Sequence, residues 1–190
     1  MDNKEKIIEA VTALLRERGE LMNEITVREI SERAGVGLGL INYHFGSKDK
    51  LIEICAMRMI NGIVEKFRSM QEETAGLSPA RRLEYLGNMT MTFLFDHYAI
   101  SKVSMLTDMA EPKENDNTHR TYAAFLPLVA ACRSDWDELT VKHKTFLLIA
   151  SMQQAFLRHQ EIFREQGINL TDTESRKSYH SRCLRDILEV

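Results

Sequence analysis

The feature that most constrains the fold is a run of about twenty-five residues, Thr26 to Leu51, in which capping residues mark the helix boundaries. Thr26 and Glu29 have the spacing of a capping box, in which each side chain accepts a hydrogen bond from a free backbone amide of the other residue. Gly35 suits the left-handed residue that closes a helix. These marks predict a helix from Thr26 to Ala34, followed by a turn.

A second helix is predicted directly after this turn. Gly37 is an acceptable cap for it, and Ile41 and Phe45 lie four residues apart on one face, where they can pack against the first helix. Gly46 and Ser47 then end it, and Ser47 caps a third helix. Two short helices around a glycine turn form a helix-turn-helix, whose second helix enters the major groove of DNA.

Several side chains near the second helix are suited to phosphate groups. Tyr43, His44 and Lys48 supply a phenol, an imidazole and an ammonium group, and the free amides after Ser47 form an anion site at a helix N-terminus. These groups would position the protein on DNA without reading its sequence.

Base contacts are predicted from the residues between 37 and 44. Gly37 and Gly39 would permit close approach of the backbone, Leu38 and Leu40 could touch thymine methyl groups, and Asn42 could pair with adenine or a phosphate. The complete predicted DNA-binding set is Thr26, Arg28, Gly37, Leu38, Gly39, Leu40, Asn42, Tyr43, His44, Ser47 and Lys48.

The segment Ala34-Gly35-Val36, followed by Tyr43-His44-Phe45-Gly46-Ser47-Lys48 and Leu51, resembles the DNA-binding domain of TetR-family (tetracycline-repressor-type) regulators. The resemblance covers about the first fifty residues. It implies a dimeric, all-helical transcriptional regulator, usually a repressor that a small ligand releases from a palindromic operator. The family often carries serine, threonine or lysine where this chain has Gly37, Leu38 and Leu40, which favours methyl contacts and DNA shape over hydrogen-bonded base reading.

Composition supports an all-α fold but gives little support to DNA binding. Three prolines and nine glycines in 190 residues favour helices throughout. The formal net charge is -3, whereas a strong nucleic-acid binder usually shows a basic patch. A second function therefore stays open: a helical ligand-carrier or protein-interaction dimer whose head, the N-terminal helix-turn-helix domain of residues 1–48, does not bind DNA.

Helical periodicity and capping signals divide the chain into two predicted domains. Residues 1–48 form a helix-turn-helix DNA-binding domain, and residues 49–190 form a helical ligand-binding and dimerisation domain. A long connector helix over residues 48–73 joins them. The last two helices, which begin at Asp135 and Thr171, are predicted to form a homodimer, because the first of them is apolar on more than one face. The predicted helices cover residues 3–18, 26–34, 37–45, 48–73, 79–97, 100–109, 118–133, 135–166 and 171–188.

Methionine and aromatic side chains cluster in the second domain. Such residues usually fill a core, but together with a few polar groups they could also line a cavity for an apolar ligand. The predicted ligand-binding set is Met89, Thr90, Phe93, Met105, Met109, Tyr122, Phe125, Phe146, Gln153 and Phe156.

Recognisable catalytic, nucleotide-binding and metal-ligand motifs are absent from the sequence, so we expect neither an enzyme nor a bound cofactor or metal. No signal peptide or long apolar run is present, which favours the cytoplasm and no membrane partner. The expected partners are a double-stranded DNA operator, a second copy of the chain and a small-molecule effector.

Overall fold

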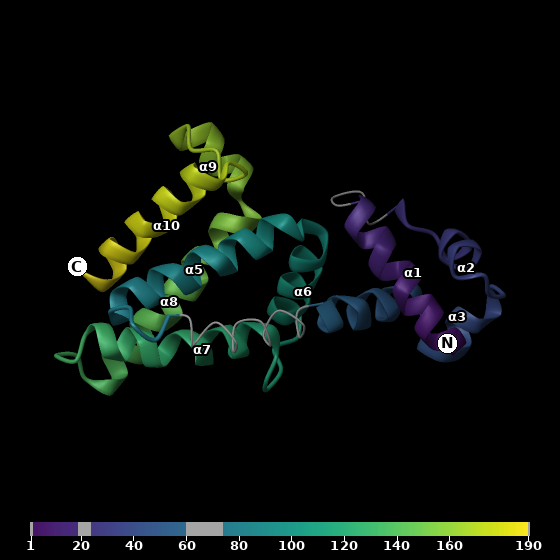
Figure 1. Ribbon diagram of the computed structural model, residues 1–190, viewed down its shortest axis with the longest axis horizontal. Helices are drawn as coiled ribbons and strands as arrows, with labels where there is room; N and C mark the ends of the chain where they lie inside the picture. Colours follow the sequence, from purple (N-terminus) through teal and green to yellow (C-terminus); the bar gives the residue numbers. More distant parts are fainter. Residues whose placement is uncertain (1, 19–23, 60–73, 190) are drawn as a thin grey trace. The chain divides into compact units, whose positions relative to one another are not determined.

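The computed structural model describes residues 2–18, 24–59 and 74–189 (Figure 1). Throughout these ranges the regular elements are helices, which confirms the all-α prediction. None of the described helices is long and apolar enough to cross a membrane. The chain divides into two compact units, one formed by residues 1–66 and 97–106 and the other by residues 67–96 and 107–190.

The first unit contains the predicted head. Its helices are α1 (Asn3–Arg18), α2 (Val27–Ala34) and α3 (Gly39–Phe45), followed by a helix that starts at residue 48 and is described to residue 59. The apolar faces of these helices meet in one core, so that the head is held together mainly by burial of aliphatic side chains. Its fully buried members include Ile7, Val11, Ile30, Ile41 and Leu51.

The start of α3 differs from the prediction. The helix begins at Gly39, not at Gly37, and Leu38 occupies the cap position without a side-chain hydrogen bond. The amide of Leu40 donates to the Gly37 carbonyl, so residues 37 and 38 form a tight turn before the helix. Glycine has no side chain with which to cap, so Gly37 could not fix the helix start.

The compact unit that contains the head extends beyond the predicted domain boundary at residue 48. Ser47 caps the next helix as predicted, because its hydroxyl accepts a hydrogen bond from the Lys50 amide at 3.1 Å. Beyond that cap, Leu51, Ile52 and Cys55 are buried in the core of the head. The remainder of the predicted connector, residues 60–73, lies outside the described residues.

The second unit is a helical bundle. It contains α5 (Pro79–Asp96), α7 (Asn117–Cys132), α8 (Glu138–Leu157), α9 (His159–Gln166) and α10 (Thr173–Leu188). The remaining helix, α6 (Tyr98–Ala110), has residues in both units, because the boundary falls between residues 106 and 107. Within the second unit α5 packs on α7 and α10, and α8 packs on α7 and α10 (Figure 1).

Two helix starts near the C-terminus were predicted at the wrong residue. The cap of α8 is Asp137, whose carboxylate accepts a hydrogen bond from the Thr140 amide at 2.7 Å. Asp135, the predicted cap, instead forms an ion pair with Arg133. Likewise α10 is capped by Asp172 and not by Thr171. In both places a nearby aspartate offers a carboxylate, which satisfies free amides well at a helix N-terminus.

The single helix predicted over residues 135–166 is interrupted. Arg158, with φ of -115° and ψ of 25°, departs from helical geometry and separates α8 from α9. His159 directly follows the break, is buried, and places its Nδ1 2.9 Å from the Phe156 carbonyl oxygen. The final helical segments therefore number three in the described chain, where the periodicity predicted two.

Candidate nucleic-acid interface and ligand groove

The helix-turn-helix is fixed by contacts at both ends of α2. The Thr26 hydroxyl accepts a hydrogen bond from the Glu29 amide at 3.1 Å, as the capping box predicts. Gly35 closes the helix with φ of 64°, a left-handed conformation that suits glycine. Arg33 donates two hydrogen bonds to Glu17 of α1, each 2.5 Å long. These contacts hold α2 against α1 and set the position from which α3 begins.

One edge of α3 is anchored in the core and another is open. Ile41 and Phe45 are buried, whereas Asn42 is exposed and Leu38 and Tyr43 are 55% and 82% exposed. Among the described residues, a methyl group placed at Gly37 or Gly39 would meet no atom beyond its chain neighbours within 4 Å. The turn and α3 therefore expose both side chains and bare backbone.

Other residues of the predicted DNA-binding set are already engaged within the head. Leu40 is half-buried and packs against the core. The ring of half-buried His44 meets that of Tyr43 edge to face, with centroids 5.1 Å apart. Lys48 donates from its Nζ to the Ile25 carbonyl at 2.9 Å. Arg28 is exposed but forms an ion pair with Glu32.

These groups differ in how many hydrogen-bond donors they still have for DNA. The Lys48 ammonium has three hydrogens, so one bond to the Ile25 carbonyl leaves donors for a phosphate. The Ser47 and Thr26 hydroxyls serve as helix caps. Leu40 contributes to the core, so a change there would alter stability as well as any base contact.

The predicted ligand-binding residues differ in burial. Phe125 and Phe156 are buried core residues, whereas Met109 and Phe146 are exposed. Met105 is buried and belongs to the first unit, while the other nine residues belong to the second. Met89 and Phe93, with the remaining members of the set, are half-buried.

Polar groups of that set are bonded within the protein. Gln153 donates from its Nε2 to the Thr118 hydroxyl at 2.9 Å, and the Thr90 hydroxyl donates to the Leu86 carbonyl of its own helix. Tyr122 approaches the Lys142 carbonyl at 3.5 Å. An internal ligand cavity lined by the predicted set remains a prediction. Among the described residues, no group of His, Cys, Asp and Glu could hold a metal ion.

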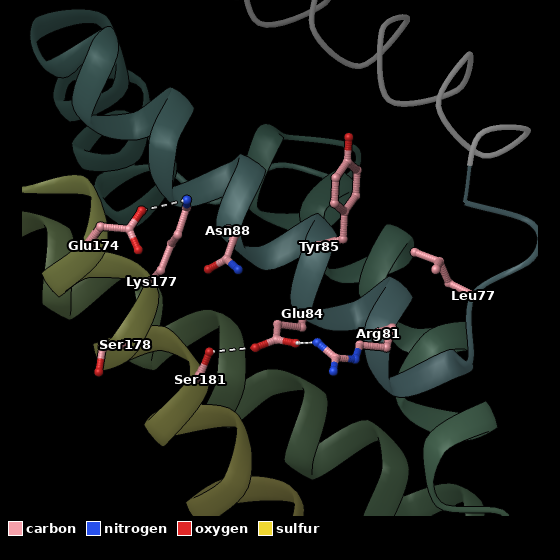
Figure 2. Close-up of a pocket in the computed structure, with 9 residues that line it drawn as sticks. All are labelled: Leu77, Arg81, Glu84, Tyr85, Asn88, Glu174, Lys177, Ser178 and Ser181. Carbon is pink, nitrogen blue, oxygen red and sulfur yellow. Dashed lines mark hydrogen bonds and ion pairs between the residues drawn. The ribbon is translucent and has the colours of Figure 1, made fainter.

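A groove between α5 and α10 was missed by sequence reasoning. It has a volume of about 640 Å³, and its lining residues are drawn in Figure 2. Sequence reasoning could not find it, because nothing in a single sequence pairs α5 with α10. The lining residues are Leu77, Arg81, Glu84, Tyr85, Asn88, Glu174, Lys177, Ser178 and Ser181.

Comparison with known proteins finds a family match for the N-terminal part of the chain. The family described as bacterial regulatory proteins, tetR family, matches residues 7–55. The chain is 30% identical over 109 residues to the HTH-type transcriptional regulator BetI of Serratia proteamaculans, a match that covers 56% of this chain and 51% of that protein. It is 27% identical over 94 residues to the HTH-type transcriptional repressor KstR2 of Mycobacterium tuberculosis, covering 50% and 45%. The matches thus span about half the length of these relatives.

Solved structures are similar over nearly the whole chain. A TetR-family transcriptional regulator from Rhodococcus sp. matches with a TM-score of 0.63 at 20% identity, covering 99% of this chain and 100% of that one. A TetR transcription regulator from Haloarcula marismortui matches with a TM-score of 0.64 at 17% identity, covering 99% and 97%. At such identities the likeness shows the fold, while the assignment to the tetR family of bacterial regulatory proteins rests on residues 7–55.

Proposed function

We propose that the chain is a cytoplasmic DNA-binding transcriptional regulator, a repressor that a small ligand releases from a palindromic operator. The open edge of α3 carries this proposal, because Leu38, Asn42 and Tyr43 are exposed while Ile41 and Phe45 anchor the helix. The family match over residues 7–55 supports it, as do the names of the relatives, a transcriptional regulator and a transcriptional repressor.

Phosphate contacts are tested first with Tyr43→Phe. This variant removes only a hydroxyl from an exposed side chain. Loss of one hydrogen bond should weaken binding to every DNA sequence by about threefold to tenfold. The slope of log affinity against log salt should stay unchanged, because the phenol carries no charge. Fluorescence anisotropy on the fragment upstream of the chain's own gene gives both quantities.

Lys48→Met is the charged counterpart. The fall of log affinity with log salt concentration should become less steep by about one unit, and the preference for the operator should be retained. Because Lys48 also bonds the Ile25 carbonyl, the melting temperature of the variant must be measured alongside. Lys113→Met, which removes an exposed lysine outside the head and outside α8, is the matched control and should leave the slope as it is. An unchanged slope in a folded Lys48→Met variant would contradict this phosphate contact.

We propose that Leu38 and Asn42 recognise DNA bases. Leu38→Ala and Asn42→Ala should each change operator preference by roughly 1 to 3 kcal/mol, the usual discrimination that one side chain gives at one base. Both side chains are exposed, so the head should keep its stability, whereas half-buried Leu40 would confound the result. A panel of operator variants read by competition measures the preference. If both variants rank the panel as the parent does, α3 does not read these bases.

Two copies are needed for a palindromic operator, and α8 offers a surface for the second copy. Leu139, Phe146 and Leu147 are large apolar residues of α8 that are exposed in the single chain. Exposed apolar side chains that share one helix commonly mark a protein interface. We therefore propose a homodimer through α8 and α10. It would place two heads on half-sites separated by about 34 to 36 Å or a multiple of that distance.

A further inference from the structure

The groove between α5 and α10 has two charged ends (Figure 2). At one end, Arg81 and Glu84 of α5 form an ion pair of 3.5 Å. At the other end, Glu174 and Lys177 of α10 form one of 2.9 Å. Exposed ion pairs contribute little to stability, so their members can change partners at small cost.

Each end has one group that is more available than its partner. Glu84 also accepts a hydrogen bond from the Ser181 hydroxyl at 2.7 Å, so Arg81 is not its only partner. The side chain of Arg81 is 75% exposed. At the opposite end the side chain of Glu174 is 80% exposed. The groove thus offers a guanidinium at one end and a carboxylate at the other.

A polar atom without a partner lies between these ends. The amide oxygen of Asn88 is buried and accepts no hydrogen bond within the described chain. Figure 2 shows the Asn88 side chain between the Glu174–Lys177 pair and the Arg81–Glu84 pair. Asn88 lines the groove, so its amide lies where a ligand held between the two ends would reach it.

The two walls of the groove are held firmly together. Gly87 of α5 lies directly against the buried ring of His180 of α10, so closely that a methyl group at Gly87 would overlap the ring. This contact sets how closely α5 and α10 approach at Gly87. Walls that are already in place favour binding, because the backbone has little order left to gain.

We propose that the α5–α10 groove binds a small zwitterion of the short-peptide type. Its carboxylate would meet Arg81, its ammonium would meet Glu174, and a central N–H would donate to Asn88. A volume of about 640 Å³ suits a ligand of this size. The proposal requires neither DNA binding nor the predicted internal cavity, so its failure and that of the proposed function can be told apart.

Isothermal titration calorimetry on the full chain, without DNA, tests the charges of the ligand. The probes are glycylglycine and triglycine, compared with their N-acetylated forms, which lack the ammonium, and their C-terminal amides, which lack the carboxylate. At least one zwitterion should bind with a millimolar or lower dissociation constant. Removing either charge should weaken it at least fivefold. No binding by either zwitterion, or equal binding by the capped forms, would overturn the proposal.

Variants then assign each charge to its residue. Arg81→Gln should remove the preference for the free carboxylate over the amide, and Glu174→Gln should remove the preference for the free ammonium. Both side chains are exposed, so neither change should unfold the chain. Asn88→Leu should weaken binding of the zwitterion, of its N-acetylated form and of its C-terminal amide by similar factors. Glu138→Gln, which breaks a similar exposed pair on α8, is the matched control. Preferences that survive in both charge variants would refute the proposed orientation.

Discussion

At the scale of single residues, His180 is the most unusual group of the second unit. Its side chain is 1% exposed, and neither ring nitrogen has a hydrogen-bond partner in the described chain. Burial lowers the pKa of His180 from 6.5 to about 4, although the nearby charge of Glu84 acts in the opposite direction. The imidazole is therefore neutral at neutral pH in the folded protein.

This depressed pKa makes the free energy of unfolding dependent on pH. Between pH 6.5 and pH 4 the unfolded chain binds a proton at His180 that the folded chain does not. Stability should therefore fall with falling pH in this window, by up to about 1.4 kcal/mol per pH unit. Urea unfolding at pH 7 and pH 5 measures the loss. His180→Gln cannot titrate and should lose less; equal losses in the two proteins would contradict the assignment.

Gly87 allows another prediction at the same scale. Gly87→Ala would push a methyl group into the ring of His180, which is buried and has little room to move. We expect a loss of about 1 to 3 kcal/mol of stability, the usual effect of overpacking. Exposed Gly76, where an added methyl group meets no atom of the described residues within 4 Å, supplies the control Gly76→Ala. Thermal melts of the two variants should differ clearly, and similar melting temperatures would argue against the close contact.

At the scale of elements, local chemistry predicted the head well. The cap at Thr26 and the left-handed Gly35 were both readable, because each depends on neighbouring residues only. Errors arose where two capping candidates lie close together, as with Asp135 and Asp137, since local sequence does not decide between them. The groove could not be predicted for another reason: Arg81 and Glu174 line the same groove only because α5 packs on α10.

The same limit applies to the ligand-binding residues that were predicted from composition, because their environments could not be read from the sequence. A methionine or aromatic residue on a helix is equally suited to a core, a surface and a cavity wall, and only packing separates these outcomes. Phe125 became a core residue, Phe146 is 62% exposed, and Met105 belongs to the first unit. Sequence periodicity predicts the fold class and most helix limits. It does not predict whether a given apolar side chain lies in the core, on the surface or at a cavity wall.

At the scale of the whole molecule, the prediction is a homodimer. Light scattering should give twice the chain mass of 21.9 kDa at micromolar concentration. Phe146→Glu places a charge on the exposed apolar face of α8 and should raise the dimer dissociation constant by about thirtyfold, as loss of a 2 kcal/mol hot spot would. Leu106→Glu, at an exposed apolar residue of α6, is the control and should remain dimeric. A monomeric parent, or equal effects of the two variants, would exclude this face.

The division of α6 between the units has a consequence for the order of folding. Ile100 of α6 is a buried member of the head's core, although the family match ends at residue 55. During synthesis, which proceeds from the N-terminus, that core lacks a component until more than half of the 190 residues have left the ribosome. The helix-turn-helix emerges early, but its supporting core is completed only when part of the second unit has also been made.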